Sequence, residues 1–160
     1  MSHKMSRKMS NDQRLAIVVS RFNAEITGGL LNGATQVLAE QSAKCDESDI
    51  FYVPGAFEIP LIAKSLAKSG RYVGIICLGC VIKGETAHFE FISLGVTVGL
   101  MQASLECEVP MTFGILTTYT DAQAEDRSRL NAHNKGRETA LACLEAARTL
   151  AEAQGRIKRI

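Results

Sequence analysis

The sequence predicts an α/β fold, a three-layer sandwich in which a four-stranded, mostly parallel sheet lies between two layers of helices. Strand-like and helix-like segments alternate four times along the chain, and the strand-like segments are almost continuously apolar. Such strands are buried on both faces, as in a parallel sheet covered by helices. With 160 residues, 46% of them hydrophobic, the chain is long enough for one domain with a core.

The first half of the chain contains two strand–helix pairs. Residues 15–19 are rich in β-branched side chains and predict a strand, and residues 23–43 have apolar positions at helical spacing. Residues 50–53 predict a short second strand. The helix after it ends before Gly70, and its apolar positions are Ile59, Ile62, Ala63 and Leu66.

The second half repeats this alternation. Residues 72–78 are apolar and partly β-branched, which predicts a buried strand, and helical periodicity runs from Thr86 to near Pro110. A fourth strand is predicted at residues 111–116. A short helix at about 122–126 and a long helix at about 136–153 follow, and one face of the long helix carries Leu141, Leu144, Ala147 and Leu150.

The two ends of the chain differ from its middle. Residues 1–13 have the positive charge of a signal-peptide n-region, but no apolar segment follows them. We therefore expect a disordered N-terminal tail (1–13), a single domain (14–154) and a C-terminal tail (155–160) in a cytoplasmic protein. Five cysteines without the spacing of a disulfide framework also fit a reducing compartment.

Composition excludes several classes of partner. The chain has 18 Lys+Arg and 17 Asp+Glu, so its net charge of +1 creates no overall attraction to nucleic acid or an anionic membrane. No apolar stretch reaches the ~18 residues that a membrane span needs. Cys77 and Cys80 form a C-x-x-C, but no second ligand pair exists, so burial is favoured over redox or metal chemistry. No metal is expected.

A strand-to-helix turn at residues 79–90 is the first candidate site. Such a turn gathers backbone N–H groups and the positive end of a helix dipole, which suits an anion at Lys83, Gly84, Glu85 and Thr86. His88 follows in the first helical turn, and histidine is the side chain whose unperturbed pKa lies near neutrality. This pairing suggests chemistry on a phosphorylated substrate, although similar turns occur in α/β domains without a catalytic role.

Other candidates follow the remaining strands, at the carboxyl edge where parallel sheets bind ligands. Phe22 and Phe57 could stack on a planar heteroaromatic ligand or pack against their own helices. Glu58 could accept hydrogen bonds from ligand hydroxyls or cap its helix. Arg127 could bind a ligand or belong to a solvated basic face. The segments that follow strands one, two and four are 21–23, 54–58 and 117–118.

These motifs closely resemble the lumazine synthase family, also called the riboflavin synthase β-subunit family. Five segments match in order and spacing: 22–23, 55–60, 79–89, 116–118 and 134–136. The resemblance covers residues 15–150 and implies a flavodoxin-like sandwich. It also implies a transferase that condenses 5-amino-6-(D-ribitylamino)uracil with 3,4-dihydroxy-2-butanone 4-phosphate to 6,7-dimethyl-8-ribityllumazine, the penultimate step of riboflavin biosynthesis. The resemblance implies no cofactor.

The resemblance assigns roles to individual residues. Phe22 would stack on the pyrimidine, and His88 would shuttle protons. Binding of the pyrimidine and its ribityl chain would involve Asn23, Ala56, Phe57, Glu58, Cys80, Val81, Ile82 and Phe113. Phosphate would be bound by Lys83, Gly84, Glu85, Thr86, Arg127 and Lys135. In the family, the residues matching Phe113 and Arg127 come from a neighbouring subunit, which implies a homo-oligomer of at least five chains with active sites at its interfaces.

One loop departs from the family pattern. Family members often carry Ala-Gly and then a Lys before Asn-Lys-Gly, whereas residues 128–133 here read Ser-Arg-Leu-Asn-Ala-His. Arg129 in place of glycine should stiffen this loop, because glycine alone reaches positive φ without strain. We therefore expect a pentamer and leave open a sixty-subunit icosahedral shell and an association with riboflavin synthase.

Two other classes of function stay open at this stage. A flavin- or lumazine-binding paralogue would keep the pocket without useful turnover, but the intact His88 and Arg127 count against it. A non-catalytic module of the receiver type would need an acidic cluster after the first strand, where this chain has residues 21–23, Arg-Phe-Asn.

Overall fold

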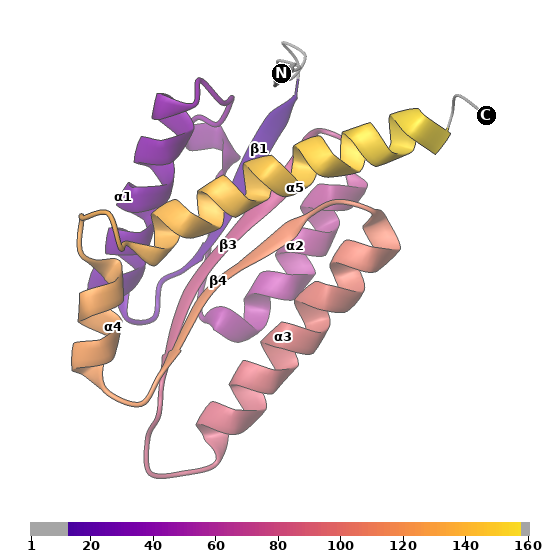
Figure 1. Cartoon of the computed structure of the whole chain (residues 1–160). Helices are drawn as coiled ribbons and strands as arrows, with labels where there is room; N and C mark the ends of the chain where they lie inside the picture. The colour runs from indigo at the N-terminus through magenta and orange to yellow at the C-terminus, as the bar shows by residue number, and fades with distance from the viewer. Residues whose placement is uncertain (1–12, 158–160) are drawn as a thin grey trace.

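The computed structural model describes residues 13–157 and contains one sheet of four strands (Figure 1). Its strands are β1 (Arg14–Ser20), β2 (Ile50–Val53), β3 (Tyr72–Ile82) and β4 (Met111–Thr118), in the order β2-β1-β3-β4. Every pairing is parallel, which confirms the predicted α/β sandwich. The predicted tail at residues 1–13 lies, apart from residue 13, outside the described residues.

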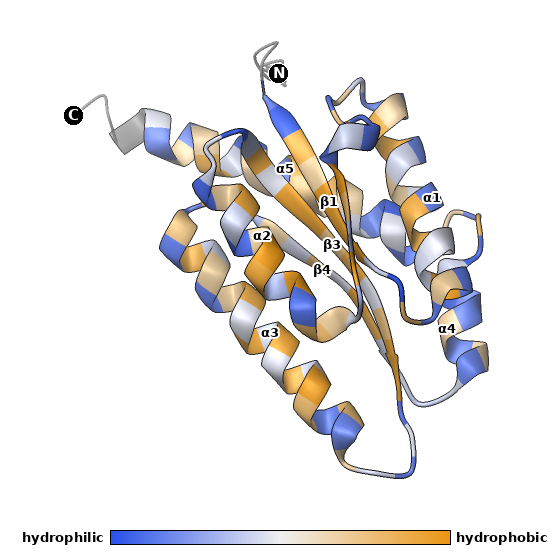
Figure 2. Ribbon diagram, turned by 180° about the vertical axis from the view of Figure 1, so that it is seen from behind, coloured by the Kyte–Doolittle hydropathy of each residue, from blue (hydrophilic) through white to orange (hydrophobic). Residues whose placement is uncertain are grey.

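Helices cover both faces of the sheet. One face packs against α1 (Ala24–Glu40), α4 (Asp121–Ser128) and α5 (Lys135–Ile157), and the other against α2 (Ile59–Lys68) and α3 (His88–Cys107) (Figures 1 and 2). Each strand therefore alternates between two cores. In β1, for example, Leu15, Ile17 and Val19 pack on the α1/α5 side, and Ala16 and Val18 on the α2 side. Burial on both faces explains the continuously apolar strands.

Strand β3 is longer than the sequence predicted. Gly79 was interpreted as the start of a turn, but β3 continues through it to Ile82. The glycine instead allows close packing, because a Cβ at this position would lie 3.2 Å from side-chain atoms of Ile115, Ile59 and Ser20. The extension pairs with β4 as far as Ile82 and Thr118. The predicted turn is therefore confined to residues 83–87.

The C-x-x-C pair lies within this strand. Cys77 faces the α2/α3 core and Cys80 faces the α1/α5 core, so the two thiols point to opposite sides of the sheet. Burial raises the pKa of both, that of Cys80 to about 11. The prediction that these cysteines are structural is consistent with this placement.

Several helices differ slightly from their predicted bounds; α1, for example, ends at Glu40 instead of residue 43. Helix α3 begins at His88 instead of Thr86, with Ala87 as its N-cap, and α5 continues to Ile157 instead of ending at Ala153. Within residues 13–157, no helix combines the length and the apolar character that a membrane crossing requires.

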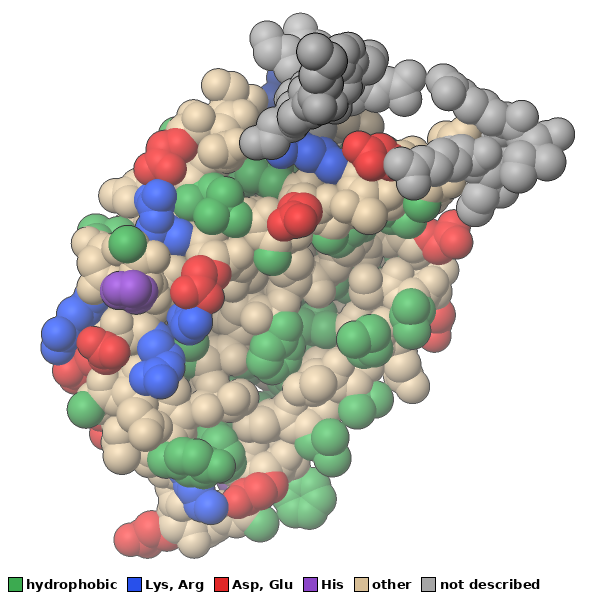
Figure 3. Space-filling model, viewed as in Figure 1, with side chains coloured by type: hydrophobic (Ala, Val, Ile, Leu, Met, Phe, Trp, Pro, Cys, Tyr) green, Lys and Arg blue, Asp and Glu red, His purple; other side chains and the backbone are tan. Residues whose placement is uncertain are grey.

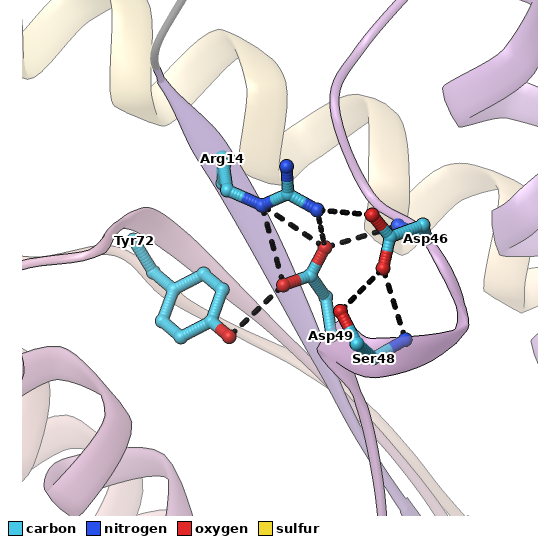
Figure 4. A network of polar contacts seen from close by, with 5 residues as sticks. All are labelled: Arg14, Asp46, Ser48, Asp49 and Tyr72. Atoms are coloured by element: carbon cyan, nitrogen blue, oxygen red, sulfur yellow. Dashed lines mark hydrogen bonds and ion pairs between the residues drawn. The ribbon is translucent and has the colours of Figure 1, made fainter.

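A polar network closes the amino end of the sheet, opposite the loops after β3 and β4 (Figures 1 and 4). Asp49, the last residue of the short 3₁₀ helix η1 (Glu47–Asp49), is fully buried. Its carboxylate accepts hydrogen bonds from the guanidinium of Arg14, from the hydroxyl of Tyr72 at 3.0 Å and from the backbone N–H of Asp46 at 3.0 Å. Asp46 also contacts Arg14. The network connects β1, η1 and β3.

Candidate active site

The carboxyl ends of the strands deliver most of the predicted site residues to one edge of the sheet. Phe22 and Asn23 follow β1, the 3₁₀ helix η2 (Ala56–Glu58) follows β2, and residues 83–88 follow β3. Because all strands are parallel, these segments lie at the same end of the molecule. The topology confirms that these segments share one edge of the sheet, and the function of that edge stays a prediction.

Asn23 joins the turn after β1 to strand β3. It adopts the left-handed conformation (φ 59°, ψ 52°) at the N-cap of α1, which asparagine tolerates better than most residues. Its side-chain amide donates a hydrogen bond to the carbonyl oxygen of Cys80 at 3.1 Å. This bond anchors the turn after β1 to the extension of β3.

The extension of β3 leaves backbone groups beside that turn. β1 pairs with β3 only as far as Val19 and Leu78, so β3 continues past the end of its neighbour. The backbone edge of residues 80–82 on the β1 side therefore has no strand partner within the described residues. Such an edge can form directional hydrogen bonds with the edge of a planar ligand.

Two aromatic side chains from the loops at this end of the sheet are largely exposed. Phe22 is 70% exposed and Phe57 is 59% exposed. The ring of Phe57 also approaches α3, since a Cβ on Gly95 would lie 3.2 Å from its Cε2 atom. The exposure of Phe22 argues against the interpretation in which its ring packs against its own helix. An exposed aromatic ring at the same end of the sheet as backbone groups without a strand partner suits a planar ligand.

Glu58 performs a capping role in this structure. Its Oε2 accepts a hydrogen bond from the backbone N–H of Gly55 at 2.9 Å, which caps η2. The side chain is exposed, whereas Ala56 in the same turn is buried. The capping interpretation thus holds, and ligand binding by the same carboxylate stays a prediction.

The loop after β3 presents His88 and the predicted anion site to solvent. The backbone N–H of His88 points to the hydroxyl oxygen of Thr86 at 3.4 Å. Lys83 forms an ion pair with Glu90 at 3.2 Å, and its Nζ lies 5.7 Å from the centre of the Tyr119 ring. A hydrogen bond from its own backbone N–H and one from Lys83 lower the pKa of Glu90. The ion pair therefore links Lys83, at the start of the loop, to the first turn of α3.

A second group of predicted residues lines a cavity of about 530 Å³ along β4, α4 and α5. Phe113 projects into it from β4, Arg127 from α4 and Lys135 from the first position of α5. The guanidinium of Arg127 donates to the carbonyl oxygen of Gln123 at 3.0 Å, and Lys135 pairs with Glu138 at 2.7 Å. Two cations therefore border this cavity.

The structure does not bring the two groups of residues into this cavity. Neither Phe22 nor His88 lines it, although Phe113 and Arg127 do. On the face shown in Figure 3, charged side chains gather near α4 and the start of α5, while hydrophobic ones gather near α3. The predicted site residues of one chain therefore form two groups, of which only the second lines this cavity.

Comparisons with known proteins show the family of the chain. The family profile described as 6,7-dimethyl-8-ribityllumazine synthase matches residues 12–151. The chain is 63% identical to "6,7-dimethyl-8-ribityllumazine synthase 1" of Caulobacter vibrioides over 86% of this chain and 90% of that protein. It is 47% identical to "6,7-dimethyl-8-ribityllumazine synthase" of Salinibacter ruber over 89% of this chain and 91% of that protein. The chain belongs to the 6,7-dimethyl-8-ribityllumazine synthase family.

The loop that departs from the usual lumazine synthase pattern is not strained at the substituted position. Arg129 has φ −61° and ψ 144°, an extended conformation open to any residue. The argument that a missing glycine stiffens this loop is therefore not supported at Arg129. The described residues with positive φ other than glycine are Asn23, Ser42 and Glu108.

Sequence reasoning missed three residues in or next to the candidate site. Glu138 lines the cavity and pairs with Lys135, and its spacing of three residues on a helix was a usable signal. Tyr119 contacts both Lys83 and the ring of Phe89, whose centre lies 6.1 Å away. Asn134 is fully buried beside the cavity, and its sequence context gave no sign of that burial.

Proposed function

We propose that this member of the lumazine synthase family carries out its reaction in a site built from two halves, one from each of two neighbouring subunits. The reaction condenses 5-amino-6-(D-ribitylamino)uracil with 3,4-dihydroxy-2-butanone 4-phosphate to 6,7-dimethyl-8-ribityllumazine, phosphate and two waters. The observation that carries the shared site is that Phe113, Arg127 and Lys135 line a cavity to which His88 and Phe22 do not contribute.

In this proposal the first half binds the pyrimidine. The ring stacks on the exposed Phe22, and backbone groups of residues 80–82 that lack a strand partner on the β1 side form hydrogen bonds with its edge. Ala56, Phe57 and Glu58 hold the ribityl chain, whose hydroxyls can donate to the Glu58 carboxylate. Phe113 of the neighbouring chain closes the ring from the other side.

The phosphate of the second substrate binds between the halves. Backbone and side-chain donors of Lys83, Gly84, Glu85 and Thr86 face it from one chain, and Arg127 and Lys135 face it from the next. Arginine forms bidentate, charge-assisted hydrogen bonds with phosphate, so Arg127 is assigned the main contact. Residues from two chains then surround a single anion.

The chemistry requires repeated proton transfer near neutral pH. The pyrimidine amine attacks the ketone, the carbinolamine loses water to form an imine, phosphate leaves by elimination, and ring closure releases a second water. His88, exposed at the start of α3 and next to the phosphate loop, is positioned to move these protons. Because both substrates are reactive, orientation in the site should supply most of the acceleration.

Helix α3 supports assembly into a homopentamer or a larger shell. Its inner face is buried through Val96, Leu100 and Ala103. Its outer face carries a second apolar stripe at alternating three- and four-residue spacing, the pattern of helices that pack against each other. This stripe consists of Phe91, Leu94, Val98, Met101 and Leu105, all exposed, and Figure 2 shows hydrophobic residues along this helix.

The cysteines support a cytoplasmic location, which we also propose. All five are free thiols. Burial raises the pKa of Cys45 and of Cys143 to about 12, so these thiols stay protonated. A chain with five free thiols is suited to a reducing compartment.

Mixing two impaired variants, assayed at a limiting concentration of the phosphate substrate, tests the shared site. Coexpressed His88→Ala and Arg127→Ala chains should assemble randomly, so about one interface in four would combine an intact half from each chain. We expect activity to recover to about a quarter of the wild-type level. Sedimentation of the same sample should show an oligomer of at least five chains. Activity no higher than the mean of the two variants would contradict the proposal.

Phe22 and Arg127 should affect different substrates. Phe22→Ala removes a stacking ring worth about 1–3 kcal/mol and should raise the KM for the pyrimidine. Arg127→Ala should raise mainly the KM for the phosphate substrate. Arg148→Ala, on the exposed surface of α5 outside the cavity, is the control for loss of a cation. Steady-state kinetics that show both variants acting on the same KM would refute this division of the site.

His88→Ala should slow turnover without weakening substrate binding. General acid–base groups contribute ~10²–10⁴, and we expect about 10² because orientation supplies most of the rate. Both KM values should stay within about twofold of wild type. His133→Ala, an exposed histidine between α4 and α5, is the matched control. A wild-type kcat that does not change between pH 6 and 8 would exclude His88 as the proton shuttle.

A further inference from the structure

A buried amide connects the elements that carry the two cations of the cavity. Asn134 has no exposed surface and lies immediately before α5. Its Nδ2 lies within hydrogen-bonding distance of three backbone carbonyl oxygens, those of Gly29 at 3.0 Å, Ser128 at 2.8 Å and Arg129 at 3.0 Å. Its Oδ1 accepts from the backbone N–H of Arg137 at 3.2 Å. One side chain therefore connects α1, the end of α4 and the start of α5.

Glycines in α1 make room for this amide. A Cβ on Gly33 would overlap the amide group of Asn134, and a Cβ on Gly29 would overlap the carbonyl group of Ser128. The control position is Gly28 in the same helix, where a Cβ would have no neighbour within 4 Å. The close approach is thus local to the face of α1 that meets the amide.

The amide holds groups on both sides of the phosphate half-site. Arg127 lies in the last turn of α4, and the carbonyl groups bound by Asn134 belong to the next two residues, Ser128 and Arg129. Lys135 is the residue directly after Asn134. Arg127 and Lys135 both line the cavity. One buried side chain therefore bonds the segments that carry both cations.

We propose that Asn134 is a positioning residue that sets the geometry of the Arg127 and Lys135 cations for the phosphate substrate. This inference rests on the proposed function, since it assigns Asn134 a role through those two side chains. Aspartate cannot replace it, because a carboxylate would face three carbonyl oxygens and have no hydrogens to donate. A shift of α4 relative to α5 would weaken phosphate binding before it affected the pyrimidine half, which belongs to other elements.

The test compares Asn134→Ser, whose hydroxyl retains one donor, with Asn134→Ala. Both folded variants should raise the KM for the phosphate substrate by about tenfold or more, as expected for misplaced binding groups. The KM for the pyrimidine should stay within about twofold of wild type. Binding of inorganic phosphate, measured by calorimetry, should weaken in parallel.

A stability-matched variant separates positioning from general destabilisation. Gly74→Ala in β3 would force a Cβ to 2.6 Å from the Sγ of Cys143, which is buried in the α1/α5 core and does not line the cavity. At an equal loss of melting temperature it should leave both KM values unchanged, and an equal shift in the KM for phosphate would overturn the inference. An unchanged KM in folded Asn134→Ser would overturn it too.

The Arg127→Ala variant distinguishes the two levels of the argument. If Arg127→Ala raises the KM for the phosphate substrate and Asn134→Ser does not, only the positioning role of Asn134 fails. If Arg127→Ala leaves that KM unchanged, the proposed phosphate site fails, and the role of Asn134 fails with it. If both variants raise it while Gly74→Ala does not, both proposals stand.

Discussion

Replacing Gly136 with alanine should destabilise the fold by more than about 3 kcal/mol, the upper range for overpacking. A Cβ at this position would overlap the backbone carbonyl group of Leu30 in α1. A backbone group cannot rotate away as a flexible side chain can, so α1 and α5 would have to separate where they pack. That separation would also displace Lys135, the preceding residue.

Gly155→Ala in the same helix provides the matched control. A Cβ there would have no neighbour within 4 Å, so the substitution should be neutral or stabilise the helix by up to about 1 kcal/mol. Urea denaturation at a fixed protein concentration measures both free energies of unfolding. Equal effects of the two substitutions would show that α1 and α5 do not approach as closely as described.

Removing the buried carboxylate of Asp49 should cost about 3 kcal/mol, as for breaking a buried ion pair from one side. Asp49→Ala leaves the Arg14 guanidinium with its exposed partner Asp46 alone and leaves the buried hydroxyl of Tyr72 without its acceptor. Glu47→Ala removes an exposed carboxylate from the same short helix and should change the stability by less than about 0.5 kcal/mol.

The same network predicts how stability depends on pH. Burial raises the pKa of Asp49. Hydrogen bonds from Arg14, Asp46 and Tyr72 lower that pKa by more than burial raises it, so the net shift is downward. The pKa of Asp46 is lowered to about 2, chiefly by hydrogen bonds from Ser48 and Arg14. A carboxylate whose pKa is lowered in the folded state stabilises the fold when the pH is above the pKa of the unfolded chain, about 4. That stabilisation is lost as the pH falls from there toward the lower pKa of the folded state.

Unfolding measured from pH 7 to pH 3 checks this dependence. The wild-type protein should lose stability mainly below about pH 4. Asp49→Asn, which has no titrating carboxyl group, should show a shallower loss over that range. Parallel curves for the two proteins would mean that Asp49 does not contribute to acid sensitivity.

Most of the fold could be predicted because its strands are buried on both faces and its helices have clear apolar periodicity. The main error came from Gly79, since glycine is common both in turns and where side chains from neighbouring elements pack closely. Sequence alone does not distinguish these roles, which depend here on Ile59 and Ile115 from distant parts of the chain. The end of β3 was therefore placed too early.

The candidate site also contains residues that the sequence could predict and residues that it could not. Residues in loops after strands, such as Phe22 and His88, could be located because a parallel sheet gathers its carboxyl ends at one edge. Asn134 could not be assigned its structural role, because its partners Gly29 and Ser128 are brought together only by the packing of α1 against α4 and α5. The division of the site between two chains was implied by the family resemblance alone, and it stays a proposal.

The extension of β3 beyond β1 determines which changes the pyrimidine site can tolerate during evolution. In the proposed site, residues 80–82 recognise the ring through their peptide groups, which every amino acid except proline supplies in full. Their side chains are selected for packing instead of ligand binding, since Cys80, for example, is buried in the α1/α5 core. Substitutions there should therefore drift according to volume and hydrophobicity while ligand specificity is retained, and proline is the replacement that such drift would avoid.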